Sequence, residues 1–369
     1  MEVLNFINTH DEFEWINILT DAPYNITVRR DGDYMMLKYS HLNSDQSIPM
    51  VRECRGVIFY KNNGIYECVC RAFDKFGNYE AYYAADIDWN SAVVQEKIDG
   101  SLIKLYHHGD SWRIATNGTI DAFKANVGDF DLSFGDLVYQ ALGGEEQFKS
   151  FCQRLKKDNT YMFELVSPMS RATIYYADTK LYYLGQRNIT TMEESNEYTD
   201  FMAQFGVLKP KIYSLSSLEE CLEYVKTMTR DEEGFVVVDG NFNRIKIKSP
   251  EYLLMFHMEN NGEVTTRRII NMMKEEKIDD FLDYLPQYTD VVNGVKESID
   301  DIALHMILET SVAFPFIKSS KEEYAKQIAK CKYKDYLFKW YDNFMDLSPY
   351  EYIMSRTTNQ ILKMIKNRC

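Results

Sequence analysis

The sequence predicts an α+β protein of two domains, a strand-rich N-terminal one followed by an all-helical C-terminal one. The length of 369 residues corresponds to about two domains of ordinary size. Short aromatic and β-branched runs, separated by Gly, Asn and Asp, dominate up to about residue 255 and are typical of strands and hairpins. Beyond residue 258 the apolar residues recur at helical spacing. We therefore expect an N-terminal domain with antiparallel sheets at residues 1–255 and a helical domain at residues 256–369.

Individual strands of the first domain can be predicted from the runs themselves. In chain order the predicted strands are "YMMLKYSH", "CRGVIFY", "VVQEK", "SLIKLYHH", "SWRIAT", "YMFELV", "KLYYLGQRN", "GFVVVD" and "NRIKIKS". Helical periodicity within this domain appears at residues 130–155 and 218–228. The C-terminal domain is predicted as a series of helices, and "SPYE" at residues 348–351 has the pattern of a capping box at a helix start.

Composition restricts the class of protein. The seven cysteines are scattered without zinc-ligand spacing, which favours reduced thiols and a cytoplasmic protein. No run approaches the roughly 20 apolar residues of a membrane span, so no membrane partner is expected. A net charge of −14 argues against coating nucleic acid through bulk charge but allows a local basic groove. Residues 316–369 carry 11 Lys and Arg against 6 Asp and Glu, which fits either an RNA surface or the solvated face of a helical bundle.

The stretch "QEKIDGSLIKLYHHGD" places Lys97 between apolar residues, just before an Asp99-Gly100 turn. A lysine at a half-buried strand end is costly unless its ammonium is paired or used. The Asp-Gly pair alone is an ordinary hairpin signal. Lys97 therefore becomes a candidate functional residue only if other positions support it.

Supporting charges alternate with core residues on other predicted strands. In "NRIKIKS", Arg244, Lys246 and Lys248 share one face of a strand, because successive side chains point to opposite sides. This face is either a solvated sheet edge or the cover of a bound anion. The preceding hairpin strand brings Glu232 or Glu233 near the end of the basic strand, as a salt-bridge partner or as an oxygen ligand for a divalent cation.

Two further strands add charges at similar places. Glu164 in "YMFELVSP" lies inside an aromatic strand, where a carboxylate must be paired or face a polar cleft. Arg55 in "VRECRGVIFY" leads into an apolar strand and suits a bidentate grip on phosphate or carboxylate, or an ion pair with Glu53. Together these residues are what a nucleotide-phosphate site with a divalent ion requires.

The order of these segments resembles a known family. "KIDG" is similar to the nucleotidyl-lysine motif of covalent nucleotidyltransferases, the superfamily of polynucleotide ligases and capping enzymes, and "FELVSP", "EEGFVVV" and "IKIKS" resemble its later motifs in the same order. The resemblance is nearest to the RNA ligases of T-even phages, the type that repairs anticodon loops, through "ECRGVIF", "DKFGN", "KIDGSL", "FELVSPMSR", "EGFVVV" and "KIKS". It covers most of residues 34–252.

The resemblance implies an ATP-dependent RNA ligase with Mg²⁺ or Mn²⁺ as the metal. Lys97 would attack the α-phosphate of ATP, and the adenylate would pass to an RNA 5′-phosphate and be displaced by a 3′-hydroxyl. By position, the resemblance assigns nucleotide contacts to Tyr39, Arg55, Lys75, Glu164, Lys246 and Lys248, and metal binding to Glu164, Glu233 and Asp279. It also implies a role for the C-terminal domain in RNA specificity.

The same resemblance implies RNA substrates and a partner enzyme, and it leaves alternative functions open. The expected substrates are RNA ends with 5′-phosphate and 3′-hydroxyl groups, including cleaved tRNA, and the expected context is RNA repair by a phage-encoded monomer beside an end-healing polynucleotide kinase. Asn117 stands where the phage relatives tend to carry a lysine, so phosphate contacts there are expected to differ. A DNA ligase or a GTP-dependent capping enzyme is the alternative within enzymes, although both usually add an OB-fold. A non-catalytic protein that binds RNA ends is the alternative outside them.

Overall fold

The computed structural model describes residues 1–40, 43–128, 130–170, 173–258, 264–274, 278, 281–282, 285–342 and 347–367. The chain divides into two compact units, Met1–Glu263 and Val264–Cys369. None of the helices in the described ranges is both long enough and apolar enough to cross a membrane.

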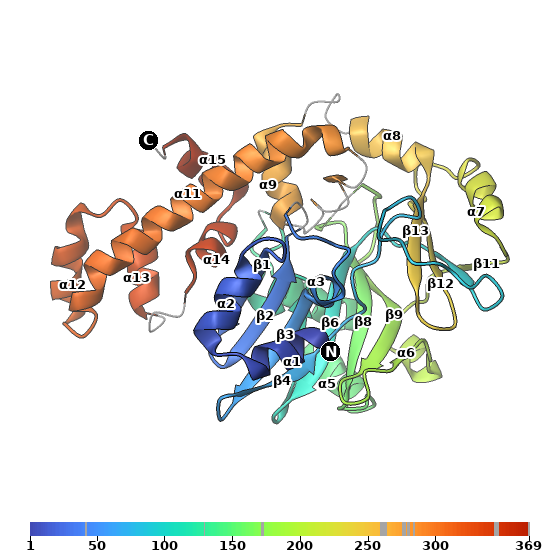
Figure 1. The fold of residues 1–369 in the computed structure, drawn as a ribbon, viewed down its shortest axis with the longest axis horizontal. Coiled ribbons are helices and arrows are strands. Elements are labelled where there is room, and N and C mark those ends of the chain that lie inside the picture. The colour runs from blue at the N-terminus through green and yellow to red at the C-terminus, as the bar shows by residue number, and fades with distance from the viewer. Residues whose placement is uncertain are drawn as a thin grey trace. The chain divides into compact units, whose positions relative to one another are not determined.

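The first unit contains three antiparallel sheets (Figure 1). The first sheet has the order β1 (Ile26–Asp31), β2 (Tyr34–Tyr39), β3 (Arg55–Asn62), β4 (Ile65–Cys70). The second has the order β10 (Glu194–Ser195), β9 (Lys180–Asn188), β8 (Asn159–Val166), β6 (Ser101–His108), β7 (Ser111–Thr116). The third has the order β11 (Ile212–Tyr213), β5 (Val93–Glu96), β12 (Gly234–Val238), β13 (Arg244–Lys248).

Helices cover one face of each sheet. The helices of the first unit are α1 (Glu2–Thr9), α2 (Glu12–Thr20), α3 (Pro49–Glu53), the 3₁₀ turn η1 (Ala122–Lys124), α4 (Phe134–Leu142), α5 (Glu145–Cys152), α6 (Asp200–Gln204), α7 (Leu218–Val225) and α8 (Pro250–Met258). Helices α1 to α3 share a buried cluster with the first sheet, α4 to α6 with the second, and α7 with the third. Burial of these apolar faces removes their side chains from water and stabilises each layer.

The first and second sheets also pack against each other. A separate buried cluster joins Ile58 and Cys70 of the first sheet to Tyr106 and Ala115 of the second. In addition, the amide of Arg71, which follows β4, donates to Thr160 Oγ1 of β8 at 3.1 Å. The segment after β4 is therefore held close to the second sheet, and the two sheets form one body.

The second unit is built from helices in its described residues. They are α9 (Thr266–Lys274), η2 (Pro286–Tyr288), α11 (Thr289–Ala313), η3 (Phe314–Phe316), α12 (Lys321–Gln327), η4 (Ile328–Lys330), α13 (Lys334–Asp342), α14 (Pro349–Met354) and α15 (Thr358–Lys366). The 25-residue helix α11 buries Val292, Ile299 and Ile302. Helix α14 begins as the "SPYE" pattern predicts, with Ser348 Oγ accepting from the amide of Glu351 at 3.1 Å.

The α+β class with antiparallel sheets is confirmed. All nine predicted strands are present, and the runs "SLIKLYHH", "SWRIAT" and "KLYYLGQRN" coincide with β6, β7 and β9. Residues 130–155 form two helices, α4 and α5, because Gly143 ends α4 in a left-handed conformation. Strand β1 was not predicted, since "ITVRRD" is half polar and only its pairing with β2 defines it.

Candidate active site

Lys97 follows β5, and the third sheet fixes its position. Its backbone amide donates to the carbonyl of Gly234 on β12 at 2.9 Å. Its ammonium Nζ lies 2.7 Å from Glu233 Oε1, the carboxylate that immediately precedes β12. The Lys97 side chain is 15% exposed and that of Glu233 only 1%, so the pair is largely removed from bulk water. Sequence analysis placed these two residues in one site, and they are in direct contact.

Lys248 is the second cation on the same carboxylate. Strands β12 and β13 pair with Gly234 opposite Lys248, so the end of the basic strand lies beside Glu233. Lys248 Nζ is 3.1 Å from Glu233 Oε1, and its side chain is 3% exposed. Of the two candidates, Glu232 and Glu233, it is therefore Glu233 that enters the cluster. Two ammonium groups on one buried carboxylate oxygen leave a local excess of positive charge, which suits an incoming anion.

The interpretation of the basic strand as a solvated sheet edge is wrong. Arg244, Lys246 and Lys248 are all buried. The outer side of β13 is covered by residues 77–79, since Lys246 donates its amide to Gly77 at 3.0 Å and accepts from Tyr79 at 3.1 Å. The burial of three like charges on one face favours the other interpretation, a strand that covers an anion.

The second carboxylate oxygen of Glu233 shows whether the site is suited to a divalent cation. Its second oxygen, Oε2, is buried and has no hydrogen-bond partner among the described residues. A buried carboxylate oxygen without a donor fits a hard cation or its bound water. The described residues contain no group of three or more His, Cys, Asp or Glu that could enclose a metal. One such oxygen suits a hard divalent cation that takes its remaining ligands from phosphates and water. The third predicted metal residue, Asp279, lies outside the described residues.

Asp99 holds the turn after Lys97. Its Oδ2 accepts the amides of Thr173 and Ile174 at 2.9 and 2.8 Å, and its own amide donates to the Tyr176 hydroxyl at 3.3 Å. Burial, and next the negative charge of Asp99, raise the pKa of Tyr176, so that this phenol stays protonated. These contacts fix the conformation of the turn that follows Lys97.

Glu164 lies beside this turn. It pairs with Leu102 across β8 and β6, and its side chain is half-buried. A Cβ added at Gly100 would come within 2.8 Å of Glu164 Cγ and 2.4 Å of the Leu165 carbonyl oxygen. Only glycine therefore fits at position 100, and the close approach brings Glu164 next to the Lys97–Gly100 segment.

Arg55, Lys75 and Tyr39 form a second group around the start of β3. The amide of Tyr39 donates to the carbonyl of Cys54, and the amide of Lys75 to that of Arg52. Lys75 Nζ lies 5.4 Å from the centre of the Tyr39 ring, and both side chains are buried. The Arg55 guanidinium lies 4.6 Å from the centre of the Phe73 ring, and its buried Nη1 has no hydrogen-bond partner within the described ranges. A buried guanidinium nitrogen without an acceptor is a site for an oxyanion.

Asn117, the departure from the family pattern, is also buried. Its Oδ1 has no hydrogen-bond partner in the part of the chain that the structure describes. Position 117 follows β7, whose Ala115 lies opposite Lys104 of β6. Lys104 is fully buried and donates to the carbonyl of Gly56, next to Arg55. A lysine is thus present near the position that lacks one, but it comes from a neighbouring strand and is already bonded to the backbone.

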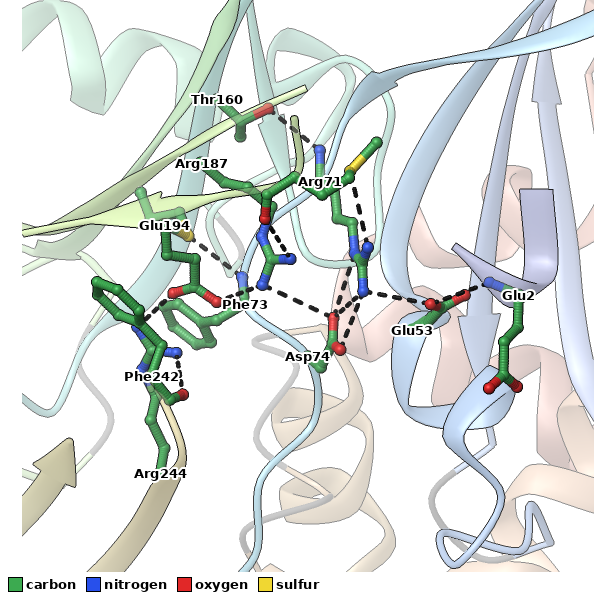
Figure 2. A network of polar contacts seen from close by, with 12 residues as sticks. Glu2, Glu53, Arg71, Phe73, Asp74, Thr160, Arg187, Glu194, Phe242 and Arg244 are labelled. Carbon is green, nitrogen blue, oxygen red and sulfur yellow. Dashed lines mark hydrogen bonds and ion pairs between the residues drawn. The ribbon is translucent and has the colours of Figure 1, made fainter. Parts of the chain in front are cut away.

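An ion-pair network was not anticipated from the sequence. It joins Glu53, Arg71, Asp74, Arg187, Glu194 and Arg244 (Figure 2). These side chains are largely buried except that of Asp74, which is 40% exposed. The members come from five separate segments of the chain, and no spacing in the sequence links Glu194 to Arg244, which lie in different sheets.

Comparison with known proteins agrees with this geometry. A family model described as RNA ligase matches residues 53–252, which contain Arg55, Lys75, Lys97, Glu164, Glu233, Lys246 and Lys248. A baculovirus protein from Autographa californica nuclear polyhedrosis virus, named as a bifunctional polynucleotide kinase/RNA ligase, is 35% identical over 279 residues. That alignment covers 71% of this chain but only 39% of the viral protein, so the chain spans about two fifths of that relative.

Two further relatives are more distant. The RNA ligase of Rhodothermus phage RM378 is 23% identical over 337 residues and covers 75% of each chain. Among solved structures, an archaeal ATP-dependent RNA ligase matches with a TM-score of 0.46 at 12% identity, over 82% of each chain. The family model, which covers more than half of this chain, decides the assignment and confirms the family predicted from the sequence. The chain belongs to the RNA ligase family.

Proposed function

We propose that the protein is an ATP-dependent RNA ligase that seals RNA 3′-hydroxyl and 5′-phosphate ends through lysyl-AMP and RNA-adenylate intermediates. The observation that supports this most strongly is the contact of Lys97 and Lys248 with one buried carboxylate oxygen of Glu233. A protein that only binds RNA ends has no need to bury an amine beside Glu233. An enzyme that presents a nucleophilic amine to a triphosphate needs that amine held in a fixed position.

In the first step, the neutral amine of Lys97 attacks the α-phosphorus of ATP. A phosphorus–nitrogen bond forms, the bond to the bridging oxygen breaks, and pyrophosphate leaves while the amine loses a proton. Lys248, on the same carboxylate oxygen, keeps a positive charge beside Glu233 when Lys97 gives up its proton. Lys246 and Lys248 would stabilise negative charge that develops on the α-phosphate.

In the next two steps, the adenylate passes from Lys97 to the RNA 5′ end and is then released as AMP. An oxygen of the RNA 5′-phosphate attacks the lysyl-AMP phosphorus, breaks its bond to nitrogen and restores the amine. The RNA 3′-hydroxyl then attacks the 5′-phosphorus, loses its proton, and releases AMP. Arg55, Lys75 and Tyr39 would hold the phosphates and the nucleotide, since Arg55 has a buried nitrogen without an acceptor.

A divalent cation, Mg²⁺ or Mn²⁺, fits beside Glu233 Oε2, with Glu164 as the second carboxylate near the turn. Such a cation supplies charge neutralisation for the phosphate oxygens. Asp279 would add a third carboxylate. The protein residues meanwhile hold the amine and exclude bulk water, since Glu233 and Lys248 are almost completely buried.

The substrates and context follow from the same family. We propose that the substrates are RNA ends, cleaved tRNA among them, in RNA repair in the cytoplasm of a phage-infected host. The helical part, residues 256–369, would select the RNA, and the protein would act as a monomer. A polynucleotide kinase would prepare the ends, as the name of the baculovirus relative suggests.

Covalent labelling tests the proposed function. The protein is stripped of bound adenylate with pyrophosphate, incubated with Mg²⁺ and ATP or GTP labelled at the α-phosphate, and run on a denaturing gel. We expect a label from ATP alone on the 43.4 kDa band, which a chase with 5′-phosphorylated RNA removes. A label from GTP would instead support capping chemistry. A stripped protein that takes up neither label would support the alternative of an RNA-end-binding protein.

Changing Glu233 to glutamine is expected to weaken the metal dependence of adenylation. The change keeps the volume but removes the charge that a cation at Oε2 would need. Losses of metal affinity for such changes are about 10- to 100-fold. The measurement is the Mg²⁺ concentration that gives half-maximal adenylation. The matched control is Glu232→Gln, because Glu232 is the adjacent carboxylate but is only half-buried and accepts the amide of Thr229. Equal effects of both changes would contradict a role for Glu233 at the metal.

A further inference from the structure

The ion-pair network of Figure 2 crosses the interior of the first unit. Arg71 donates to Asp74 at 2.8 Å and to Glu53 at 3.4 Å, and Glu53 in turn accepts the amide of Val3 at 2.9 Å. On the other side Arg187 lies 3.9 Å from Asp74 and bonds to Glu194. With Arg244, which contacts Glu194, the network contains three arginines and three carboxylates, so its formal charges balance.

Arg244 is the point where this network reaches β13. Its Nη2 donates to Glu194 Oε2 at 2.6 Å, and its Nη1 donates to the carbonyl of Phe242 at 3.0 Å. Its guanidinium also lies 4.8 Å from the centre of the Phe73 ring, the ring that Arg55 contacts at 4.6 Å. Arg244 was grouped with Lys246 and Lys248 as a possible anion contact, but its donors face protein acceptors.

Glu194 belongs to a different sheet from Arg244. It lies on the two-residue strand β10, opposite Arg187 of β9, and its side chain is 8% exposed. The Arg244–Glu194 pair therefore ties the third sheet to the edge of the second. Strand β13 has a buried carboxylate at each end, Glu194 at Arg244 and Glu233 at Lys248, with Lys246 between them.

We propose that Glu194 is a positioning residue for adenylation, which acts through Arg244 to fix strand β13 and hence Lys246 and Lys248 relative to Lys97. This inference rests on the proposed function, because it assigns the lysines to the reacting phosphate. Glu194 touches no reacting atom itself. A strand that is bonded only through its backbone can slide or tilt slightly. A buried, two-pronged guanidinium contact at one end restricts that motion.

The test compares Glu194→Gln with the wild-type protein in single-turnover adenylation with labelled ATP. Displacing a catalytic group by about 1 Å can cost up to about 100-fold in rate. We expect the adenylation rate at saturating ATP to fall at least tenfold, while the ATP concentration for half-maximal rate changes less than threefold. A general loss of folded protein would instead lower the final amount of label and leave the rate constant of labelling unchanged.

The matched control is Glu53→Gln. Glu53 belongs to the same network and has a similarly buried side chain, 10% exposed against 8%, but it contacts Arg71 and the first turn of α1. It should lose stability, while the adenylation rate constant of the folded protein stays within threefold of the wild type. If Glu194→Gln does not fold, Arg244→Lys replaces it. This variant keeps the charge but cannot reach Glu194 and the Phe242 carbonyl with a two-pronged group, so the same loss of rate at saturating ATP is expected.

Two outcomes separate this inference from the proposed function. If the wild-type protein forms no covalent adenylate, the proposed function fails. If the wild-type protein is labelled but Glu194→Gln and Arg244→Lys match Glu53→Gln in rate constant and in half-maximal ATP concentration, the network is only structural and the positioning role is overturned.

Discussion

Replacing Lys97 with alanine should reduce covalent adenylation to background. The variant lacks the amine that follows β5 and lies 2.7 Å from Glu233 Oε1. Lys248 Nζ is 3.1 Å from the same oxygen, but its side chain is 3% exposed and anchored in β13. The measurement is the amount of label from α-labelled ATP per mole of stripped protein. Sealing of RNA that has been pre-adenylated at its 5′ end should survive, since that step needs no lysine nucleophile.

The control for this change is Lys211→Ala. Lys211 lies one residue before β11, beside the same strand β5, but its side chain is exposed. Labelling of Lys211→Ala should equal that of the wild type. Labelling of Lys97→Ala above a few per cent of wild type would show that another residue carries the adenylate and that the mechanism proposed for Lys97 is wrong.

Replacing Gly234 with alanine should have the largest effect on stability. Gly234 has φ of +136°, a region that L-residues rarely adopt, and its added Cβ would lie 2.1 Å from the carbonyl oxygen of Ile247. Strain in such a region costs about 1–3 kcal/mol and forced overlap about 1–3 kcal/mol more. We expect the free energy of unfolding of the first unit to fall by about 3–5 kcal/mol. Denaturant titration followed by circular dichroism measures this change.

Gly144→Ala separates backbone strain from overlap. Gly144 has φ of +112°, but a Cβ there would meet nothing within 4 Å. It should therefore cost only the strain of the backbone, about 1–3 kcal/mol. If Gly234→Ala were no worse than Gly144→Ala, then β12 and β13 would separate easily, and the close pairing that holds Glu233 against Lys248 would not be as tight as the register implies.

Most of the first unit could be predicted because its strands carry their own signals. "SLIKLYHH" is a mainly apolar and aromatic run that ends at a Gly-Asp turn, so its limits are local properties of the chain. Strand β1 and the two-residue strands β10 and β11 lack that signal, and they exist because a neighbouring strand offers its edge. Burial of Arg244, Lys246 and Lys248 was equally beyond prediction, because the residues that cover β13 lie at positions 77–79.

The candidate site was predicted mainly through ordered motifs. Lys97, Glu233 and Lys248 were named from the sequence, and they lie in contact. Their physical relation, two cations on one oxygen, was not predictable, because it depends on the register of β12 and β13. The network through Glu194 could not be found either, since its members are ordinary charged residues whose partners lie far away in the sequence, as Arg244 and Glu194 do at 50 positions.

Because Lys97 and Lys248 share the Glu233 carboxylate, the net charge of the site changes during the proposed reaction. Before modification, Lys97 and Lys248 both offer a positive charge to Glu233 Oε1. Once the Lys97 nitrogen is bonded to phosphorus it is neutral, and the adenylate brings a negative charge of its own. Glu233 then keeps a single cationic neighbour from the original pair. The modified and unmodified enzymes should consequently differ in their affinity for cations and for the negatively charged RNA end, so that adenylation itself can set the order in which the substrates bind.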